Sequence, residues 1–291
     1  MDCHTTNSGS TLAGVGSIAL VGHPNVGKSV LFQRLTGQRV IVSNYPGTTV
    51  EVSRSALRDQ PNITLVDTPG VIAFPPKSDD ERVTEQLLLD ESLNAIVQVG
   101  DAKNLRRTLL FTVQLAEMGV PMVLALNMMD EANTRGVVIQ HQKLAERLGL
   151  PIIPTTAIRN QGVKEIDSVL RTITPINLKI SYPQVIEDLV TELSFHIPNA
   201  PISKRAMALL WLSDDKESEQ WLLQHAGSSK VDTLEKILAE AQKSSSLSLS
   251  EIIQNTRLDY IRELADDVLT ESGSHWRGFS ASLGTLTTHP V

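Results

Sequence analysis

Between residues 18 and 173, short runs of consecutive apolar residues alternate with segments whose apolar residues recur every three or four positions. The first kind predicts strands buried on both faces, and the second predicts amphipathic helices. The predicted strands are 18–21, 62–66, 95–99, 121–126 and 151–154, and the predicted helices are 31–35, 78–89, 105–118, 140–148 and 163–173. This alternation favours an α/β fold with a mostly parallel sheet and helices on both faces.

The region between the first helix and the second strand has a different pattern. Residues 38–49 carry the turn formers Ser43, Asn44, Pro46 and Gly47, which predict an exposed loop. Residues 50–58 alternate between apolar and polar positions, as in a half-buried strand. We expect this strand to form a hairpin with 62–66.

From residue 182 to residue 269 the apolar spacing is helical. Three faces are predicted, with the apolar sets Val185, Leu189 and Leu193; Leu234, Ile237 and Leu238; and Ile261, Leu264 and Val268. Linkers are expected at 198–201, 227–229 and 244–250. We therefore divide the chain into a flexible start (1–16), an α/β domain (17–175), a small all-α bundle (176–271) and a tether (272–291).

Composition narrows the classes of protein further. The 291 residues carry a net charge of −7 with 41% hydrophobic residues, which is typical of a globular protein and argues against broad nucleic-acid binding. The one cysteine, Cys3, excludes an internal disulfide. No apolar run approaches the ~18 residues of a membrane span, and residues 1–16 lack the features of a signal peptide, so the cytoplasm is the expected location.

The strand at 18–21 leads into a loop of the form G-x-x-x-x-G-K-[ST]. Its sequence GHPNVGKSV comprises Gly22, His23, Pro24, Asn25, Val26, Gly27, Lys28, Ser29 and Val30. Between a strand and a helix this pattern predicts a P-loop, in which backbone N–H groups and the helix N-terminus bind phosphates. Lys28 would contact the β- and γ-phosphates, and the Ser29 hydroxyl would bind Mg²⁺.

Two further motifs follow predicted strands. Asp67-Thr-Pro-Gly70 fits a segment in which Asp67 holds Mg²⁺ through water and the Gly70 amide reaches the γ-phosphate, although by itself it also fits a plain turn. Asn127-Met128-Met-Asp130 is similar to the N-K-x-D element, whose aspartate accepts two hydrogen bonds from guanine. Met128 replaces the usual lysine.

A last loop, Thr155-Thr156-Ala157, is similar to the S-A-x loop that contacts guanine O6 through a backbone amide, with Thr156 in place of serine. Other candidates have simpler interpretations. His23 is predicted to line the loop, Trp211 and Trp221 to pack in a core, and Asp80 and Glu81 to cap a helix at Ser78.

Taken in order, GHPNVGKS, NYPGTTVE, DTPG, GDAKNL, ALNMMD and TTA resemble the cytosolic N-terminal region of the FeoB family of bacterial ferrous iron transport proteins. The resemblance covers about residues 17–173 strongly and the helical remainder more weakly. It implies a Ras-like P-loop NTPase of the TrmE-Era type, followed by a helical domain that stabilises the GDP-bound state. It also implies a GTPase switch coupled to Fe²⁺ transport, on the cytoplasmic face of the bacterial inner membrane.

The resemblance also implies roles for single residues. Thr49, in the segment Gly47-Thr48-Thr49, would be the switch threonine that closes on Mg²⁺ and the γ-phosphate. Asn25 would help to hold an activating K⁺ between the phosphates. The catalytic set is then Lys28, Asn25, Thr49 and Gly70. The implied partners are GTP and GDP, a transmembrane domain of the same protein, small accessory Feo proteins and further copies of the chain, with no nucleic acid.

The residue after Gly70 is Val71, where Ras-like proteins carry a glutamine that positions water. A valine side chain cannot orient water, so slow intrinsic hydrolysis is predicted. Two alternatives stay open: a soluble ribosome-assembly GTPase of the Era or EngA kind, and a nucleotide-binding regulatory module with negligible hydrolysis.

Overall fold

A computed structural model describes residues 16–37, 39–176, 178–244 and 248–271. The predicted flexible start and tether lie outside these residues, apart from Gly16. The strands are β1 (Gly16–Gly22), β2 (Ile41–Asn44), β3 (Glu51–Ala56), β4 (Ile63–Asp67), β5 (Ala95–Asp101), β6 (Met122–Asn127), β7 (Val137–Ile139), β8 (Ile152–Pro154) and β9 (Leu269–Glu271).

The helices alternate with these strands and then follow one another. They are α1 (Lys28–Leu35), α2 (Asp79–Asp90), α3 (Leu105–Glu117), α4 (Met129–Thr134), α5 (His141–Leu148), α6 (Val163–Leu170), α7 (Gln184–His196), α8 (Lys204–Leu212), α9 (Lys216–His225), α10 (Ser228–Ser244) and α11 (Leu249–Val268). Two short 3₁₀ turns cover Ala102–Asn104 and Ala157–Arg159.

The main sheet has seven strands in the order β2-β3-β4-β1-β5-β6-β8. β1 pairs in parallel with β4 and β5, and the parallel pairing continues through β6 to β8. β3 pairs antiparallel with β4, so the predicted hairpin is present, and the predicted α/β fold is confirmed. Because the central strands are parallel, their carboxyl ends lie along one edge, where ligands bind in such sheets.

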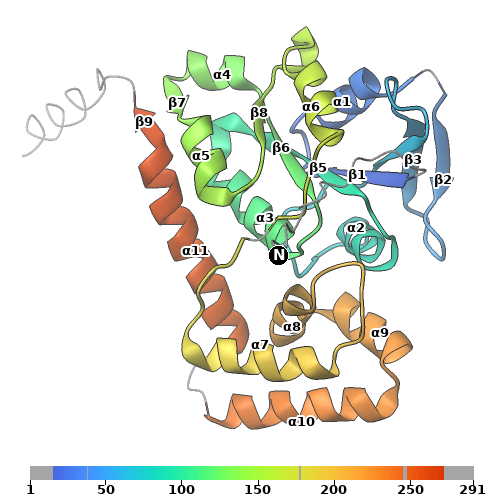
Figure 1. Ribbon diagram of the computed structural model, residues 1–291, viewed down its shortest axis with the longest axis vertical. Coiled ribbons are helices and arrows are strands. Elements are labelled where there is room, and N and C mark those ends of the chain that lie inside the picture. Colours follow the sequence, from blue (N-terminus) through green and yellow to red (C-terminus); the bar gives the residue numbers. More distant parts are fainter. Residues whose placement is uncertain (1–15, 38, 177, 245–247, 272–291) are drawn as a thin grey trace, which may run out of the picture.

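The sheet separates two apolar clusters. One lies between the sheet and helices α1 and α6, and includes Phe32, Leu35 and Ile166. The other lies on the opposite face under α2, α3 and α5 and continues without a break into α7, α8 and α11. Figure 1 shows the helical domain on this second side, with α11 running along α3 and α5. The two domains therefore share one core, so the helical domain packs directly on the α/β domain.

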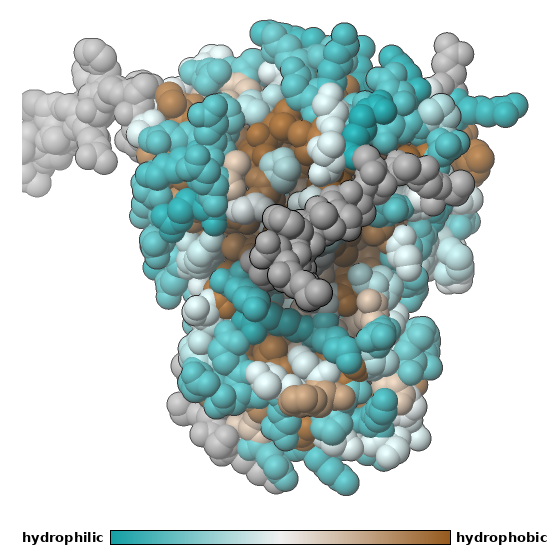
Figure 2. Space-filling model, in the orientation of Figure 1, coloured by the Kyte–Doolittle hydropathy of each residue, from teal (hydrophilic) through white to brown (hydrophobic). Residues whose placement is uncertain are grey.

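The outermost surface of both domains is mostly hydrophilic on the face drawn in Figure 2, with hydrophobic residues chiefly in the recesses. Among the described residues, no helix has the length and apolar character needed to cross a bilayer.

Several predictions at element level were wrong. Residues 41–44, predicted as loop, form the edge strand β2, which pairs antiparallel with β3. All four of its side chains are exposed, so the segment has no alternation of apolar and polar positions that could reveal a strand. The predicted linker at 227–229 is shorter, because α10 already begins at Ser228. In α7 the buried face contains Ile186 rather than Val185, which is exposed.

Candidate functional site

The predicted P-loop connects β1 to α1 at the carboxyl edge of the sheet. Gly27 has a φ of 89° and is the N-cap of α1, a left-handed conformation that glycine adopts without steric cost. Gly22 is closely packed, since a Cβ there would lie 2.5 Å from the carbonyl oxygen of Val99. Asn25 also has a positive φ, of 64°. The loop therefore has the curled backbone of a phosphate-binding nest.

Lys28, the first residue of α1, points toward the end of β4. Its Nζ lies 2.5 Å from Oδ1 of Asp67, and both side chains are largely buried. Burial raises the pKa of the Asp67 carboxyl group, while the nearby Lys28 ammonium lowers it. The P-loop cation and the DTPG carboxylate are thus direct neighbours, as the sequence motifs require for a shared phosphate and metal site.

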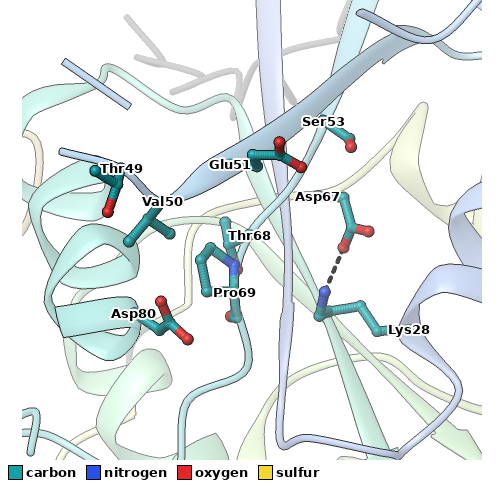
Figure 3. A pocket seen from close by; sticks show the side chains of 9 residues that line it. All are labelled: Lys28, Thr49, Val50, Glu51, Ser53, Asp67, Thr68, Pro69 and Asp80. Atoms are coloured by element: carbon teal, nitrogen blue, oxygen red, sulfur yellow. Dashed lines mark hydrogen bonds and ion pairs between the residues drawn. The ribbon is translucent and has the colours of Figure 1, made fainter. Parts of the chain in front are cut away.

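This ion pair lies at the wall of a cavity of about 500 Å³ (Figure 3). The cavity is lined by Lys28, Thr49, Val50, Glu51, Ser53, Asp67, Thr68, Pro69 and Asp80. Thr49 comes from the loop before β3, and Asp80 from the first turn of α2. The loop before β3 and the first turn of α2 thus both contribute side-chain oxygen atoms to this cavity.

The DTPG segment packs against the P-loop through its backbone. The Val71 N–H donates to the carbonyl of Gly22 over 3.0 Å, and the Thr68 hydroxyl donates to the carbonyl of Leu20 over 3.1 Å. A Cβ on Gly70 would lie only 2.9 Å from the ring of Pro24. A glycine is therefore needed here, because it lets the two loops approach each other.

Asn127, at the end of β6, joins the P-loop to the last motif. Its side-chain amide donates to the carbonyl of Val26 over 2.9 Å, and its oxygen accepts from the Ala157 N–H over 3.0 Å. The residue is almost completely buried. Both ends of its side chain are engaged by the protein, so Asn127 sets the distance between the phosphate loop and the TTA loop.

Asp130 and Met128 follow Asn127 directly. Met128 has a φ of 64° and is the N-cap of α4, and Asp130 lies in the first turn of that helix. The Asp130 carboxylate is 3.5 Å from the guanidinium of Arg159, which follows the TTA loop and is largely exposed. Within that loop, Thr155 and Thr156 are buried, and the Thr155 carbonyl accepts from the Met129 N–H over 3.2 Å. The two loops predicted to bind the base therefore touch each other.

The segment after Gly70 contributes one residue to the core and is held in place by the Glu81 side chain. Val71 is fully buried in the core. The Glu81 carboxylate accepts from the backbone N–H groups of Ile72 and Lys77, over 3.0 and 2.7 Å. The Ser78 hydroxyl accepts from the Glu81 N–H, so half of the predicted capping box is present. The other half is wrong, since the Glu81 side chain braces the preceding loop instead.

The remaining predicted residues are dispersed around the P-loop. His23 is buried with its ring 5.8 Å from that of Phe111, and burial, with Arg107, lowers its pKa. Pro24, Asn25 and Ser29 are exposed, Val26 is buried, and Val30 is half-buried. Gly47 has a φ of 77°, and the Thr48 hydroxyl donates to the carbonyl of Tyr45 over 3.0 Å. The structure thus places Thr49 at the cavity while Thr48 stabilises the loop.

Sequence reasoning did not identify Glu51, Ser53 and Arg159. Glu51 and Ser53 line the cavity from alternate positions of β3. Glu51 ends the NYPGTTVE motif, whereas the alternate spacing is the signal in the sequence for Ser53. Arg159 has no signal of its own, because its neighbour Asp130 is distant in the chain.

Comparison with known proteins matches both domains. A family model described as "Ferrous iron transport protein B" matches residues 16–170, and one described as "FeoB cytosolic helical domain" matches residues 182–270. The Fe(2+) transporter FeoB of Staphylococcus aureus (strain COL) is 30% identical over 279 residues, which are 93% of this chain and 41% of that protein. This chain therefore spans about two fifths of the length of that relative.

Two other similar proteins add detail. An Fe(2+) transport protein A/Fe(2+) transporter FeoB fusion protein of Porphyromonas gingivalis is 34% identical over 220 residues, covering 70% of this chain and 26% of that one. A crystal structure of a mutant S. thermophilus NFeoB bound to GDP superposes with a TM-score of 0.78 and 28% identity, covering 88% of this chain and all of that one. With both domains matched in order, the chain belongs to the FeoB family of ferrous iron transport proteins.

Proposed function

We propose that this chain is a Mg²⁺-dependent GTP-binding module that hydrolyses GTP slowly. We further propose that it is coupled to Fe²⁺ transport on the cytoplasmic face of the bacterial inner membrane. The observation that carries the proposal is the meeting of residues 22–30, 67–70, 127–130 and 155–157 at one edge of the sheet, with Asn127 bonded to both the P-loop and the TTA loop. The GDP in the similar S. thermophilus structure supports the same site.

The phosphates of the nucleotide would lie over the P-loop and the N-terminus of α1. There the loop amides and the helix dipole favour negative charge, and Lys28 supplies a full positive charge. The Gly70 amide, held close to Pro24, would donate to the γ-phosphate. Lys28 and Gly70 thus lie on the two loops that meet at the start of α1.

Mg²⁺ fits the residues that are present. It prefers oxygen ligands, and Asp67 and Thr49 line the same cavity, with the Ser29 hydroxyl one residue beyond Lys28. When bound, the ion would neutralise charge on the β- and γ-phosphates. Lys28 and Asp67 are paired over 2.5 Å, so the side chain that would hold the phosphates and the one that would hold the metal through water are direct neighbours.

Guanine would be selected by Asp130. A carboxylate accepts from both N1–H and the 2-amino group of guanine, whereas adenine offers neither arrangement. Backbone amides of the TTA loop would approach O6, at a distance that Asn127 sets. Met128 would pack its aliphatic side chain on the base.

Hydrolysis would be slow, because Val71 is buried and cannot orient water. The backbone around Gly47 and Thr49 and a K⁺ ion held with Asn25 are the groups that we propose for catalysis. The same observation favours a second candidate function, a nucleotide-binding regulatory module with negligible hydrolysis. Multiple-turnover phosphate release, measured with and without K⁺, distinguishes the two.

The proposed partners follow from the family. Residues 182–270 match the FeoB helical domain, so a ribosome-assembly GTPase is no longer a candidate. We propose a transmembrane domain of the parent protein as the main partner. The fusion in P. gingivalis supports a small A-type Feo protein as a second one, and further copies of the chain are a third.

The direct test is calorimetric titration with GTP, GDP and ATP. Lys28→Ala and Asp130→Ala should each weaken binding of GTP and GDP by about 10- to 150-fold, the loss expected when a charged hydrogen-bonding contact is removed. Lys164→Ala is the matched control, since Lys164 is exposed on α6 and should bind as the wild type does. Unchanged GTP affinity in both site variants would defeat the assignment.

A further inference from the structure

Two buried carboxyl groups meet at the contact between α2 and α9, outside the nucleotide pocket. Glu85 lies on α2, and Asp215 is the N-cap of α9. Their exposed fractions are 0% and 1%. Figure 1 shows that this contact joins the helix after the DTPG loop to the helical domain.

Three oxygen atoms of this pair have no donor among the described residues: both carboxyl oxygens of Glu85, and Oδ2 of Asp215. The other Asp215 oxygen accepts from the Ser218 N–H over 2.7 Å. The pair lies next to the 2.6 Å hydrogen bond between Gln86 of α2 and Glu217 of α9, and each carboxyl group affects the pKa of the other. Two ionised carboxylates can only accept hydrogen bonds, so they would repel each other in a medium that does not solvate them.

One proton resolves this conflict. A protonated Glu85 can donate to Oδ2 of Asp215, which gives the orphaned acceptor a donor and removes one of the two charges. Asp215 is the better place for the remaining charge, since it caps a helix N-terminus and accepts the Ser218 N–H.

Burial and the neighbouring charges also favour a protonated Glu85. Burial raises the pKa of Glu85 well above its usual value, and Asp215 and Glu217 raise it further. Burial also raises the pKa of Asp215, whereas its bonds with Ser218 and Glu85 lower it. Glu217 accepts from Gln86 over 2.6 Å and lies 3.8 Å from Arg82 on α2, so its own charge is compensated.

Among the described residues, Lys216, next to Asp215 on α9, is a further charged group near the pair. It is mostly exposed and bonds to Glu219 over 2.8 Å, so it faces solvent instead of the buried pair. Among the described residues, therefore, no cation takes the place of the proton in neutralising the Glu85–Asp215 pair.

We propose that Glu85 and Asp215 form a proton-dependent latch between α2 and the helical domain. With the shared proton in place, α2 packs against α9. Loss of the proton leaves two carboxylates facing each other and weakens this contact.

The latch is linked to the nucleotide site through α2 itself. The Thr84 hydroxyl, next to Glu85, donates to the carbonyl of Pro69 in the DTPG loop over 3.1 Å. A displaced α2 would therefore disturb the loop that we propose to contact the γ-phosphate. This consequence rests on the proposed function, whereas the latch does not.

The first experiment measures the latch without nucleotide, as urea unfolding from about pH 5 to about pH 8. Because folding raises the pKa of Glu85, the folded state binds the extra proton, and its stability must fall as pH rises from the unfolded pKa through the folded one. Glu85→Gln keeps a donor for Asp215 but cannot titrate. Over this range the folding equilibrium constant of the wild type should fall at least about tenfold relative to that of Glu85→Gln.

Glu146→Gln is the matched control, since Glu146 is exposed on α5, and its profile should follow the wild type. If Glu85→Gln does not fold, Asp215→Asn replaces it, because asparagine caps helices equally well and its amide can donate to Glu85. It should make the same profile less steep, because the Asp215 charge that helps to raise the pKa of Glu85 is removed while burial still raises it. Parallel profiles for the wild type and the latch variant overturn the proposal.

The second experiment separates the latch from the proposed function. Hydrogen exchange of the α2 amides and dissociation of a fluorescent GDP are compared between wild type and Glu85→Gln at each pH. The latch is supported if the α2 amides exchange faster in the wild type than in Glu85→Gln and this difference grows with pH. If the difference is seen but no nucleotide binds, only the proposed function fails. Nucleotide binding with identical exchange in both proteins overturns the latch alone.

Discussion

Removing the Asn127 side chain tests whether one buried amide organises the site. Asn127→Ala leaves the Val26 carbonyl and the Ala157 N–H without their partners. A buried polar group without a partner costs about 1–3 kcal/mol, so the two together cost roughly 2–6 kcal/mol. We expect the lower half of this range, because the loops can relax toward water. The loss would still be a large part of the ~5–15 kcal/mol that stabilises a domain.

Two assays measure this prediction. Urea unfolding should show a loss of about 2–4 kcal/mol. The GDP affinity should fall at least about tenfold, because the P-loop and the TTA loop lose their fixed spacing. Asn104→Ala is the control, since Asn104 is exposed and, in the part of the chain that the structure describes, its side chain bonds to Asp101 at the surface. It should change either quantity little. If Asn127→Ala unfolds at the wild-type urea concentration and binds GDP normally, the bridging role is wrong.

Three further predictions concern other parts of the molecule. Asp130→Asn should bind guanine nucleotides more weakly and xanthine nucleotides more tightly, because the asparagine amide can donate to the 2-oxo group of xanthine. Competition titrations with GDP and XDP measure this change, and an unchanged preference for GDP contradicts it. Arg257→Met should destabilise the fold by about 3–5 kcal/mol, because Arg257 forms a buried ion pair of 2.8 Å with Glu117. Adding Glu117→Leu should recover part of this loss of stability in urea unfolding, and a double variant no more stable than Arg257→Met would contradict the prediction. Phosphate release should be at least about tenfold faster in KCl than in NaCl, which is a small part of the rate enhancement that a cation at the transition state supplies. Asn25→Ala should remove the difference between the two salts, and equal wild-type rates in the two salts would exclude the K⁺ site.

The parts of the fold that could be predicted are those whose burial is encoded locally. The strands that became β1, β5 and β6 are apolar at nearly every position because both sheet faces are covered, and that pattern is visible without knowing the neighbours. The edge strand β2 has both faces exposed and so lacks such a pattern. β7 and β9 are three residues each and pair across nearly half of the chain, which local pattern cannot indicate.

The same division applies to the candidate site. Motif spacing placed Lys28, Asp67 and Asp130 on loops that follow strands, and parallel pairing brings those loops to one edge. Which of the residues contact one another was not predictable. The Glu81 side chain braces a loop instead of completing a capping box, and Glu85 meets Asp215 from another domain. Both outcomes depend on packing between segments that are separate in the chain.

The attachment of α11 has a mechanical consequence. Its C-terminal end is attached to the part of the α/β domain that follows Asp130, since β9 pairs with β7 and Asp267 bonds to Lys143 and Arg147 of α5. The helix that follows the DTPG loop, α2, instead contacts α9. The helical domain is thus held to the α/β domain at two separate places, so a displacement of α2 would act on the bundle at only one of them.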